Sequence, residues 1–404
     1  MATKSDWNMN LRVSIVVLVA AWFASFAATA GAAEVLPARD VCQPTTAART
    51  RDGNCVPCAV GPISTRPGFL ALLEQVRTRR AAFADIDRRI DGASSDPEVQ
   101  SLLQGRNLAL ALYGSDADFI AGGNASRCLM GDNEAARARA TPIACDAIPR
   151  EGLVVLLTAG QSNISNTGAP DQSGRLYQPH NRFYNFDRFD GRCYVARNPL
   201  LGTPGGGENV ATRLGDELID RGLAKTVVIA PVAIGGTYLE EWRARGGKYF
   251  EVLLATIAGL RDAGLEPSAV LWHQGEHNAF AFSTNGAEDG THLQVTPKMK
   301  EAGRLSYLRN YLEIVAGLRA ADVTAPIFVA TATLCGSVPD EIIRSAQAAV
   351  PNPALGVHPG PDTDQIGLTL RHDGCHMSRA GTELHARMWA DRLAEFWKSG
   401  ARRP

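Results

Sequence analysis

Residues 153–163 read Leu-Val-Val-Leu-Leu-Thr-Ala-Gly-Gln-Ser-Asn, an apolar run that ends in a glycine followed by polar residues. A run of this length without polar alternation is typical of a strand buried on both faces of a parallel sheet. Runs of the same kind follow at 226–234, 269–272 and 327–333. Together the four runs predict the centre of a parallel sheet.

Amphipathic stretches accompany these apolar runs. Helix candidates lie at about 209–221, 249–263, 306–318, 340–349 and 380–397. Strands and helices that alternate with right-handed crossovers place helices on both faces of one sheet. The pattern therefore predicts an α/β fold, a three-layer α/β/α sandwich with a parallel sheet, for residues 151–404.

The composition is that of a globular protein with a sizeable core. The chain has 404 residues, of which 45% are hydrophobic and 21% are charged, so it is long enough for two domains. Its 41 basic residues balance 42 acidic ones, for a net charge of -1. Such a balance gives no general attraction to nucleic acid or to an anionic membrane, and it favours a neutral substrate.

The first 33 residues have the pattern of a secretory signal. Lys4 and Arg12 precede an uncharged, mostly apolar run at 13–33 that ends in small residues. Signal peptidase cleaves after such residues, so we expect a mature chain that begins near Gly31 or Glu34. The alternative is an uncleaved anchor, for which the run is short. We expect an exported protein, periplasmic or secreted, with no stable membrane span after cleavage.

Residues 34–150 differ in character from the rest of the chain. A polar lead with cysteines is followed by apolar residues at helical spacing between about 69 and 90, and by a second helical stretch at about 97–121. We interpret this part as a small, Cys-containing helical region. No residue pattern within it indicates chemistry.

Eight cysteines follow the signal, an even number in a compartment where disulfides persist. Cys55 and Cys58 have the spacing of a redox or zinc pair, but no second pair of that kind accompanies them. We interpret them as structural, bonded near Cys42 or onto Cys128 and Cys145. Spacing alone leaves the connectivity open.

Polar motifs follow the predicted strands, where ligands bind in an open parallel sheet. Gly-Gln-Ser-Asn occupies 160–163, Gly-Gly-Thr occupies 235–237 and His-Gln-Gly-Glu occupies 273–276. A fourth motif, Arg-His-Asp-Gly-Cys-His, occupies 371–376 just before the last helix. These motifs are the predicted functional residues.

The motifs contain the parts of a serine nucleophile. A serine hydroxyl needs a base to accept its proton, and the base needs a carboxylate to orient it. Ser162 is the candidate nucleophile, His376 the base and Asp373 its partner, with His372 as the alternative base. The Ser162 N–H, a glycine N–H from 205–207 and the Gln274 amide are candidate donors to an acyl oxyanion.

The four motifs together resemble the SGNH-superfamily hydrolases of the sialate O-acetylesterase type, relatives of the carbohydrate esterase family 6 acetylesterases. The resemblance covers about residues 153–389. It implies a flavodoxin-like α/β/α sandwich and a carboxylic ester hydrolase that removes O-acetyl groups from an acetylated carbohydrate. It also implies that Ser162, Asp373 and His376 form the catalytic triad, without a cofactor or a metal.

The resemblance assigns further residues to the site. Ser162, Gly207 and Gln274 would form the oxyanion hole, although Gln274 could instead order its loop. Glu276 is a possible assistant of His376. The other supporting residues are Gln161, Asn163, Gly236 and Thr237.

Two other classes of function compete with this hypothesis. One is a catalytically idle carbohydrate-binding or envelope protein on the same scaffold, which would be free to lose the serine or the histidine. The other is a zinc peptidase, because His273 and His277 fit the His-x-x-Glu-His pattern of inverted zinc peptidases. That pattern requires a helix, whereas His273 directly follows a predicted strand and a glycine lies at the motif's centre.

Overall fold

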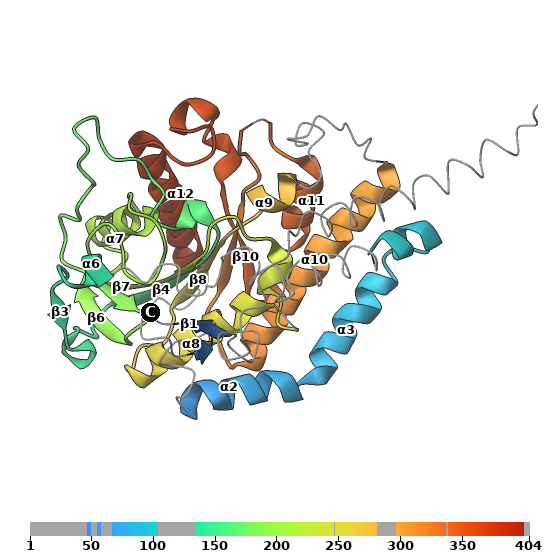
Figure 1. Ribbon diagram of the computed structural model, residues 1–404, viewed down its shortest axis with the longest axis horizontal. Coiled ribbons are helices and arrows are strands. Elements are labelled where there is room, and N and C mark those ends of the chain that lie inside the picture. The colour runs from blue at the N-terminus through green and yellow to red at the C-terminus, as the bar shows by residue number, and fades with distance from the viewer. Residues whose placement is uncertain are drawn as a thin grey trace, which may run out of the picture. The chain divides into compact units, whose positions relative to one another are not determined.

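The computed structural model describes residues 47–49, 55–57, 67–103, 134–245, 247–280, 296–336 and 338–399. The predicted signal at 1–33 lies outside these residues. The described part is built around one eight-stranded sheet (Figure 1). A separate antiparallel pair is formed by β1 (Ala47–Arg49) and β2 (Cys55–Pro57).

The sheet has the order β10-β9-β8-β4-β7-β5-β6-β3. Six neighbouring strands, from β10 to β5, are parallel, while β6 is antiparallel to β5 and β3 is antiparallel to β6. The strands are β3 (Pro142–Ile143), β4 (Leu153–Gly160), β5 (Tyr184–Asp187), β6 (Arg192–Val195), β7 (Thr226–Ala233), β8 (Ala269–His273), β9 (Ile327–Thr331) and β10 (Val357–Asp362). The four predicted strands are confirmed as β4, β7, β8 and β9.

The pairing of the central strand β4 aligns the strand ends that carry the motifs. It pairs with β7 along its whole length, so that Gly160 lies opposite Ala233, and with β8, so that Gly160 also lies opposite His273. The carboxyl ends of three strands thus coincide at one edge of the sheet. The motifs that follow them are therefore neighbours in space.

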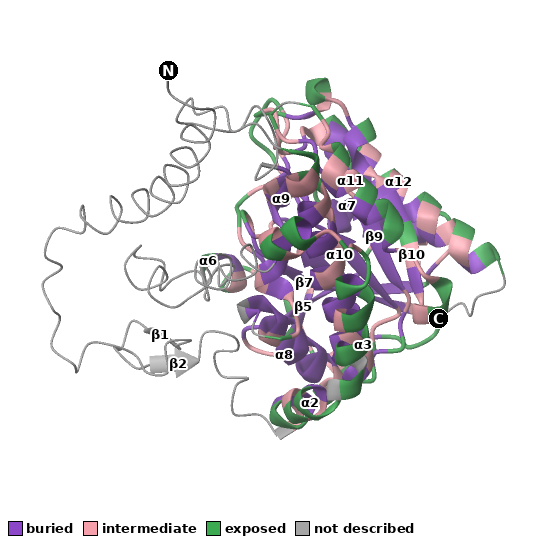
Figure 2. Ribbon diagram, turned by 90° about the vertical axis from the view of Figure 1, so that its right-hand side faces the viewer, coloured by how far each residue is buried: buried purple, intermediate pink, exposed green. Residues whose placement is uncertain are grey.

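Helices cover both faces of the sheet, as predicted. On one face α7 (Val210–Asp220) packs against α12 (Arg379–Lys398), and the other face carries α8 (Lys248–Asp262), α10 (Pro297–Ala320) and α11 (Glu341–Ala349). Alternate residues of β4 divide between the two layers, since Val154 and Leu156 belong to the first core and Val155 and Leu157 to the second. Figure 2 shows the buried strands between helices with exposed outer faces.

Two N-terminal helices add to the second layer. Helix α2 (Pro67–Thr78) packs on α8, and α3 (Arg80–Asp91) packs on α10, as Figure 1 shows. Their buried Phe69 and Phe83 join the same hydrophobic core as the sheet. The helical prediction for this part is confirmed as far as it is described; the stretch predicted at 97–121 is helical to residue 103, and the remainder lies outside the described residues.

The remaining elements are short. They are α6 (Glu134–Arg137), α9 (Glu276–Phe280), and the 3-10 turns η4 (Cys145–Ala147), η5 (Ser162–Ile164), η6 (Leu239–Trp242), η7 (Pro353–Leu355), η8 (Thr363–Gln365) and η9 (Leu368–Leu370). In the part of the chain that is described, no helix combines the length and the apolar character that crossing a bilayer requires.

Two disulfides are present among the described residues. Cys145 is bonded to Cys193 in β6, and Cys335 is bonded to Cys375. The prediction that the Cys55 and Cys58 pair could bond onto Cys145 is therefore wrong, because Cys145 already has a partner across the sheet edge. Cys42, Cys58 and Cys128, and the side chain of Cys55, lie outside what is described.

Candidate active site

Ser162 directly follows the end of β4 and begins the tight turn η5. The turn depends on Gly160, whose φ is +132° and where an added Cβ would lie 1.9 Å from the carbonyl oxygen of His273. Only glycine fits both the conformation and the space. The Gln161 N–H then donates to the same carbonyl at 2.9 Å, which aligns the turn with the end of β8.

The backbone around Ser162 is firmly held. Its carbonyl accepts hydrogen bonds from the Ser165 N–H at 2.8 Å, the Ser165 hydroxyl at 2.8 Å and the Thr167 hydroxyl at 2.6 Å. Ser162 is 8% exposed, and within the described chain its own hydroxyl makes no hydrogen bond. Gly235 lies beside it, since a Cβ there would be 3.5 Å from Ser162 Cβ. The Ser162 side chain thus sits on a rigid turn.

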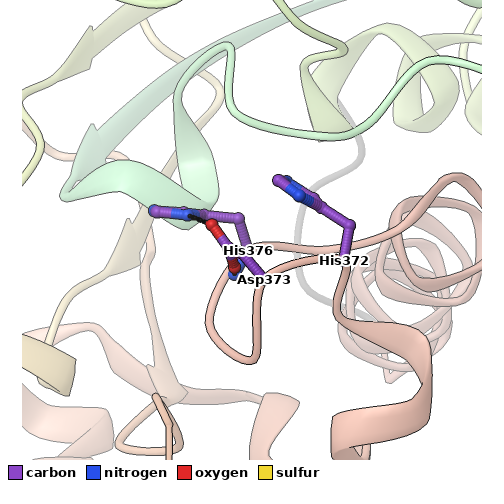
Figure 3. Close-up of side chains that lie close together, drawn as sticks. All are labelled: His372, Asp373 and His376. Carbon is purple, nitrogen blue, oxygen red and sulfur yellow. Dashed lines mark hydrogen bonds and ion pairs between the residues drawn. The ribbon is translucent and has the colours of Figure 1, made fainter.

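Asp373 and His376 form a hydrogen-bonded pair on the loop before α12 (Figure 3). The distance between His376 Nδ1 and Asp373 Oδ2 is 2.6 Å, and Asp373 Oδ1 accepts from the N–H groups of Cys375 at 2.8 Å and His376 at 2.6 Å. Partial burial raises the pKa of Asp373, but the hydrogen bonds from His376 and Cys375 outweigh it and hold that pKa well below its usual range. An ionised Asp373 keeps the proton of His376 on Nδ1 and leaves Nε2 as an acceptor.

Three contacts join this loop to the segment that begins with Ser162. Asn163 Nδ2 donates to the Cys375 carbonyl at 3.3 Å, His372 Nε2 lies 3.2 Å from the Thr167 carbonyl, and the Ala169 N–H donates to the Met377 carbonyl at 3.0 Å. The immediate neighbours of Ser162 and His376 are therefore in contact. Asp373 is hydrogen-bonded to His376 and not to His372 among the described contacts.

A buried polar network lies behind the Ser162 turn. Glu276 Oε1 accepts from Asn163 Nδ2 at 2.9 Å and lies 2.9 Å from His273 Nε2, and Glu276 is 2% exposed. Burial raises the pKa of Glu276, but the charge of His273 and the hydrogen bonds from His273 and Asn163 lower it to about 2. The expected assistance to His376 is not direct, because the Glu276 carboxylate binds these two residues. Among the hydrogen bonds of the described residues, its link to the His376 loop runs through Asn163.

Gln161 and Thr237 support the site through the fold. Gln161 Oε1 accepts the N–H groups of Gly275 at 3.3 Å and His277 at 3.2 Å. The hydroxyl of Thr237, which is fully buried, donates to the Ile234 carbonyl and accepts from Trp242. Both side chains order the backbone beyond the strand ends.

The structure does not support Gln274 as an oxyanion donor. Its amide donates to the Thr237 carbonyl at 2.9 Å and to Asn278 Oδ1 at 2.6 Å, and the residue is 0% exposed. Tyr307 donates to its carbonyl and lies 3.2 Å from its Oε1. Both amide hydrogens are therefore used, and loop ordering is the role that this geometry favours.

Gly207 is likewise engaged within the fold. Its N–H donates to the Asn166 carbonyl at 2.9 Å, and an added Cβ would lie 2.3 Å from the Gly168 carbonyl oxygen. This N–H is thus not available to an oxyanion. By contrast, the N–H groups of Ser162 and Gly235 make no backbone hydrogen bond within the described residues. Gly236, with φ of +65°, serves the turn after β7.

The zinc site suggested by the His-x-x-Glu-His pattern is not formed. His273 is the last residue of β8, whereas His277 lies in α9, and the His277 ring packs at a tilt against Tyr238 with ring centroids 4.1 Å apart. His273 is buried against Glu276 and packs on His385. The two histidines do not share a helical face.

The sequence hypothesis missed two features that hold the His376 loop. Arg371 is buried and donates to the carbonyls of Cys375 at 2.6 Å, Thr363 at 2.9 Å and Ile366 at 3.0 Å. The Cys335–Cys375 disulfide ties the same loop to the segment after β9. Arg371 and Cys375 both lie in the motif at 371–376. The disulfide partner of Cys375 is 40 residues away, and Arg371 binds backbone carbonyls, which no residue pattern marks.

The structure predicts a specific outcome for Gln274→Ala. The change removes the donor to two buried acceptors, the Thr237 carbonyl and Asn278 Oδ1, of which Asn278 Oδ1 keeps its bond from the Leu239 N–H. An unpaired buried acceptor costs about 1–3 kcal/mol, so the melting temperature falls clearly. The fold-change in kcat stays well below the roughly 10²–10³ expected for loss of an oxyanion donor. Thermal unfolding and acetate release measured together check this. An unchanged melting temperature with a kcat loss of that size would restore Gln274 to the oxyanion hole.

The sequence of this chain matches a known protein family. The model for carbohydrate esterases described as sialic acid-specific acetylesterases matches residues 152–395, more than half of the chain. The chain belongs to this family. As a sialic acid-specific acetylesterase family member it is a carbohydrate O-acetylesterase, a carboxylic ester hydrolase that acts on an acetylated carbohydrate.

Several solved structures are similar to this chain at low sequence identity. A protein of Arabidopsis thaliana is 21% identical with a TM-score of 0.46, over 60% of this chain and 98% of its own. A carbohydrate acetylesterase from Xanthomonas citri is 18% identical with a TM-score of 0.38, over 61% and 57%. An acetylxylan esterase from Geobacillus stearothermophilus is 14% identical with a TM-score of 0.35, over 59% and 94%. No curated protein sequence matches this chain.

Proposed function

We propose that this acetylesterase is an exported enzyme that works through an acyl-enzyme intermediate on Ser162. The observation that carries the proposal is the hydrogen bond between Asp373 and His376. Their loop is in turn hydrogen-bonded to the Ser162 turn through Asn163. That pair leaves Nε2 of His376 as a base. The hydroxyl of Ser162 has no hydrogen-bond partner within the described chain.

The first half-reaction transfers the acetyl group to the enzyme. The Ser162 oxygen attacks the acetyl carbonyl carbon while His376 Nε2 takes its proton, and the charge of Asp373 stabilises the resulting imidazolium. The tetrahedral intermediate then breaks its bond to the sugar oxygen, which receives the proton from His376. The products are the free sugar hydroxyl and acetyl-Ser162.

The second half-reaction regenerates the enzyme. A water molecule gives a proton to His376 and its oxygen attacks acetyl-Ser162. Collapse of the intermediate returns the proton to the Ser162 oxygen and releases acetate. No cofactor is consumed in either half.

Backbone donors support the oxyanion of both intermediates in this proposal. We retain the Ser162 N–H from the sequence hypothesis and assign the Gly235 N–H as its companion in place of Gly207. A Cβ added at Gly235 would be in van der Waals contact with the Ser162 side chain, so this residue lies beside it, whereas the Gly207 N–H is already donated to Asn166. Preorganised N–H donors of this kind act where charge develops.

Export and domain organisation complete the proposal. Residues 1–33 have the pattern of a cleavable signal, and two disulfides lie in the described part, which suits an oxidising compartment. The proposed mature enzyme has a helical N-terminal region at 34–150 and a catalytic domain at 151–404. The N-terminal helices α2 and α3 brace the catalytic sheet from outside α8 and α10.

Acetate release tests this function. The full chain is incubated with a panel of acetylated glycans, including acetylated xylan, sialic acid and peptidoglycan, with and without EDTA or a serine-directed phosphonate. We expect acetate release that EDTA leaves unchanged and the phosphonate abolishes. Glycan binding without acetate release would favour the idle binding protein, and loss of activity in EDTA would favour metal-dependent hydrolysis.

A further inference from the structure

His372, Asp373 and His376 form a cluster of side chains of the types that ligate metal ions (Figure 3). Each offers a ligand atom, and these atoms lie within 4.8 Å of one another. The two imidazole rings are nearly parallel, with an interplanar angle of 28° and centroids 6.1 Å apart. No other group of three histidines, cysteines or acids in the described part of the chain meets this spacing. The two imidazoles therefore face the same space.

The cluster is open to solvent and only partly engaged. His372 and Asp373 are exposed, and the side chain of His376 is 27% exposed. His372 contacts the Thr167 carbonyl through Nε2, and His376 contacts Asp373 through Nδ1. One ring nitrogen of each histidine thus makes no hydrogen bond among the described residues. A solvated ion can reach both.

We propose that these three residues bind a divalent transition-metal ion, Zn²⁺ in the first instance, and that the bound ion inhibits the esterase. Two imidazole nitrogens and one carboxylate oxygen are a common three-ligand set for zinc, with water in the fourth position. Zinc–ligand distances of about 2.0–2.2 Å require the ligand atoms to approach one another to roughly 3.4 Å. Rotation of exposed side chains on a loop that contains Gly374, with φ of +81°, supplies this contraction.

Inhibition follows from the bond that the ion makes, and it rests on the proposed function of His376 as the base. An ion on Nε2 occupies the lone pair that must accept the Ser162 proton. An ion on Nδ1 displaces Asp373 from its hydrogen bond. Either arrangement stops proton transfer.

Calorimetric titration of the full chain with ZnCl₂ tests the site independently of activity. We expect one zinc ion per chain, and His372→Gln should weaken its binding at least about 10-fold because one of three ligands is lost. The matched control is His180→Gln, which removes an exposed histidine that lies beside Asp216 and Asp220 but has no second imidazole. Its zinc affinity should equal that of the wild type. The reverse pattern in the two variants, or no binding at all, would overturn the site.

Initial rates on an aryl acetate test the consequence. Each variant is compared with its own zinc-free rate. Zinc should inhibit the wild type and His180→Gln at the concentrations that saturate the site, His372→Gln should need at least about 10-fold more zinc, and EDTA should restore activity. Mg²⁺, which prefers oxygen ligands, should have no effect. Zinc binding at the cluster without inhibition would keep the site but contradict His376 as the base, and inhibition insensitive to His372→Gln would overturn the proposal.

Discussion

Replacing Ser162 with alanine lowers kcat on an aryl acetate on the order of 10⁶-fold, the loss seen when a serine protease loses its nucleophile. The reason is chemical. The Ser162 side chain lies beside Gly235, and the next residue, Asn163, donates to the Cys375 carbonyl in the His376 loop. Loss of the oxygen removes the atom that forms the acyl-enzyme. Steady-state hydrolysis with stopped-flow controls measures the effect.

The fold should survive this substitution. The three hydrogen bonds at residue 162 are accepted by its backbone carbonyl, which alanine keeps. The matched control is Ser165→Ala, which removes a hydroxyl of the same turn that donates to that carbonyl. It should lower the melting temperature slightly and retain most of kcat. Wild-type rates in Ser162→Ala would refute the nucleophile.

Replacing Asp373 with asparagine lowers kcat about 10⁴-fold, as in serine protease triads, because the amide favours the wrong tautomer of His376. The amide oxygen of the substituted side chain can still accept the backbone N–H groups of Cys375 and His376. The loop should therefore remain in place while the carboxylate charge beside Nδ1 is lost. Kinetic constants and melting temperature of this variant separate the two effects.

Asp171→Asn is the control for that experiment. Asp171 also closes a turn, since its Oδ1 accepts the N–H groups of Ser173 and Arg175 at 2.9 Å each, but none of its partners among the described residues is a histidine. This variant should keep the wild-type kcat. Equal activity in both variants would show that Asp373 only shapes its loop, and His376 would then act without a charged partner.

Strand prediction succeeded where burial leaves a simple pattern. Strands β4, β7, β8 and β9 are covered on both faces, so their sequences are continuous apolar runs. Strand β5 has the sequence Tyr-Asn-Phe-Asp, in which Asn185 and Asp187 are buried and have hydrogen-bond partners elsewhere in the fold. Strand β10 contains Pro359 and Gly360. A strand that contains polar side chains bonded to distant groups is not an apolar run, so its sequence does not predict a strand.

The geometry of the candidate site was predictable only where its parts are local in sequence. Asp373 and His376 are three residues apart, and Gly160 with Ser162 marks the turn after β4. Which amide donors remain available was not predictable, because the partners of Gln274 come from Thr237 and Asn278. The disulfides depend in the same way on contacts between distant segments.

Mass-spectrometric mapping of the enzyme after reaction with a serine-directed phosphonate tests the central claim most directly. The account predicts one adduct per chain, on the peptide that contains Ser162, formed in step with the loss of acetate release. An adduct on another residue, or full inactivation with Ser162 unmodified, would contradict it.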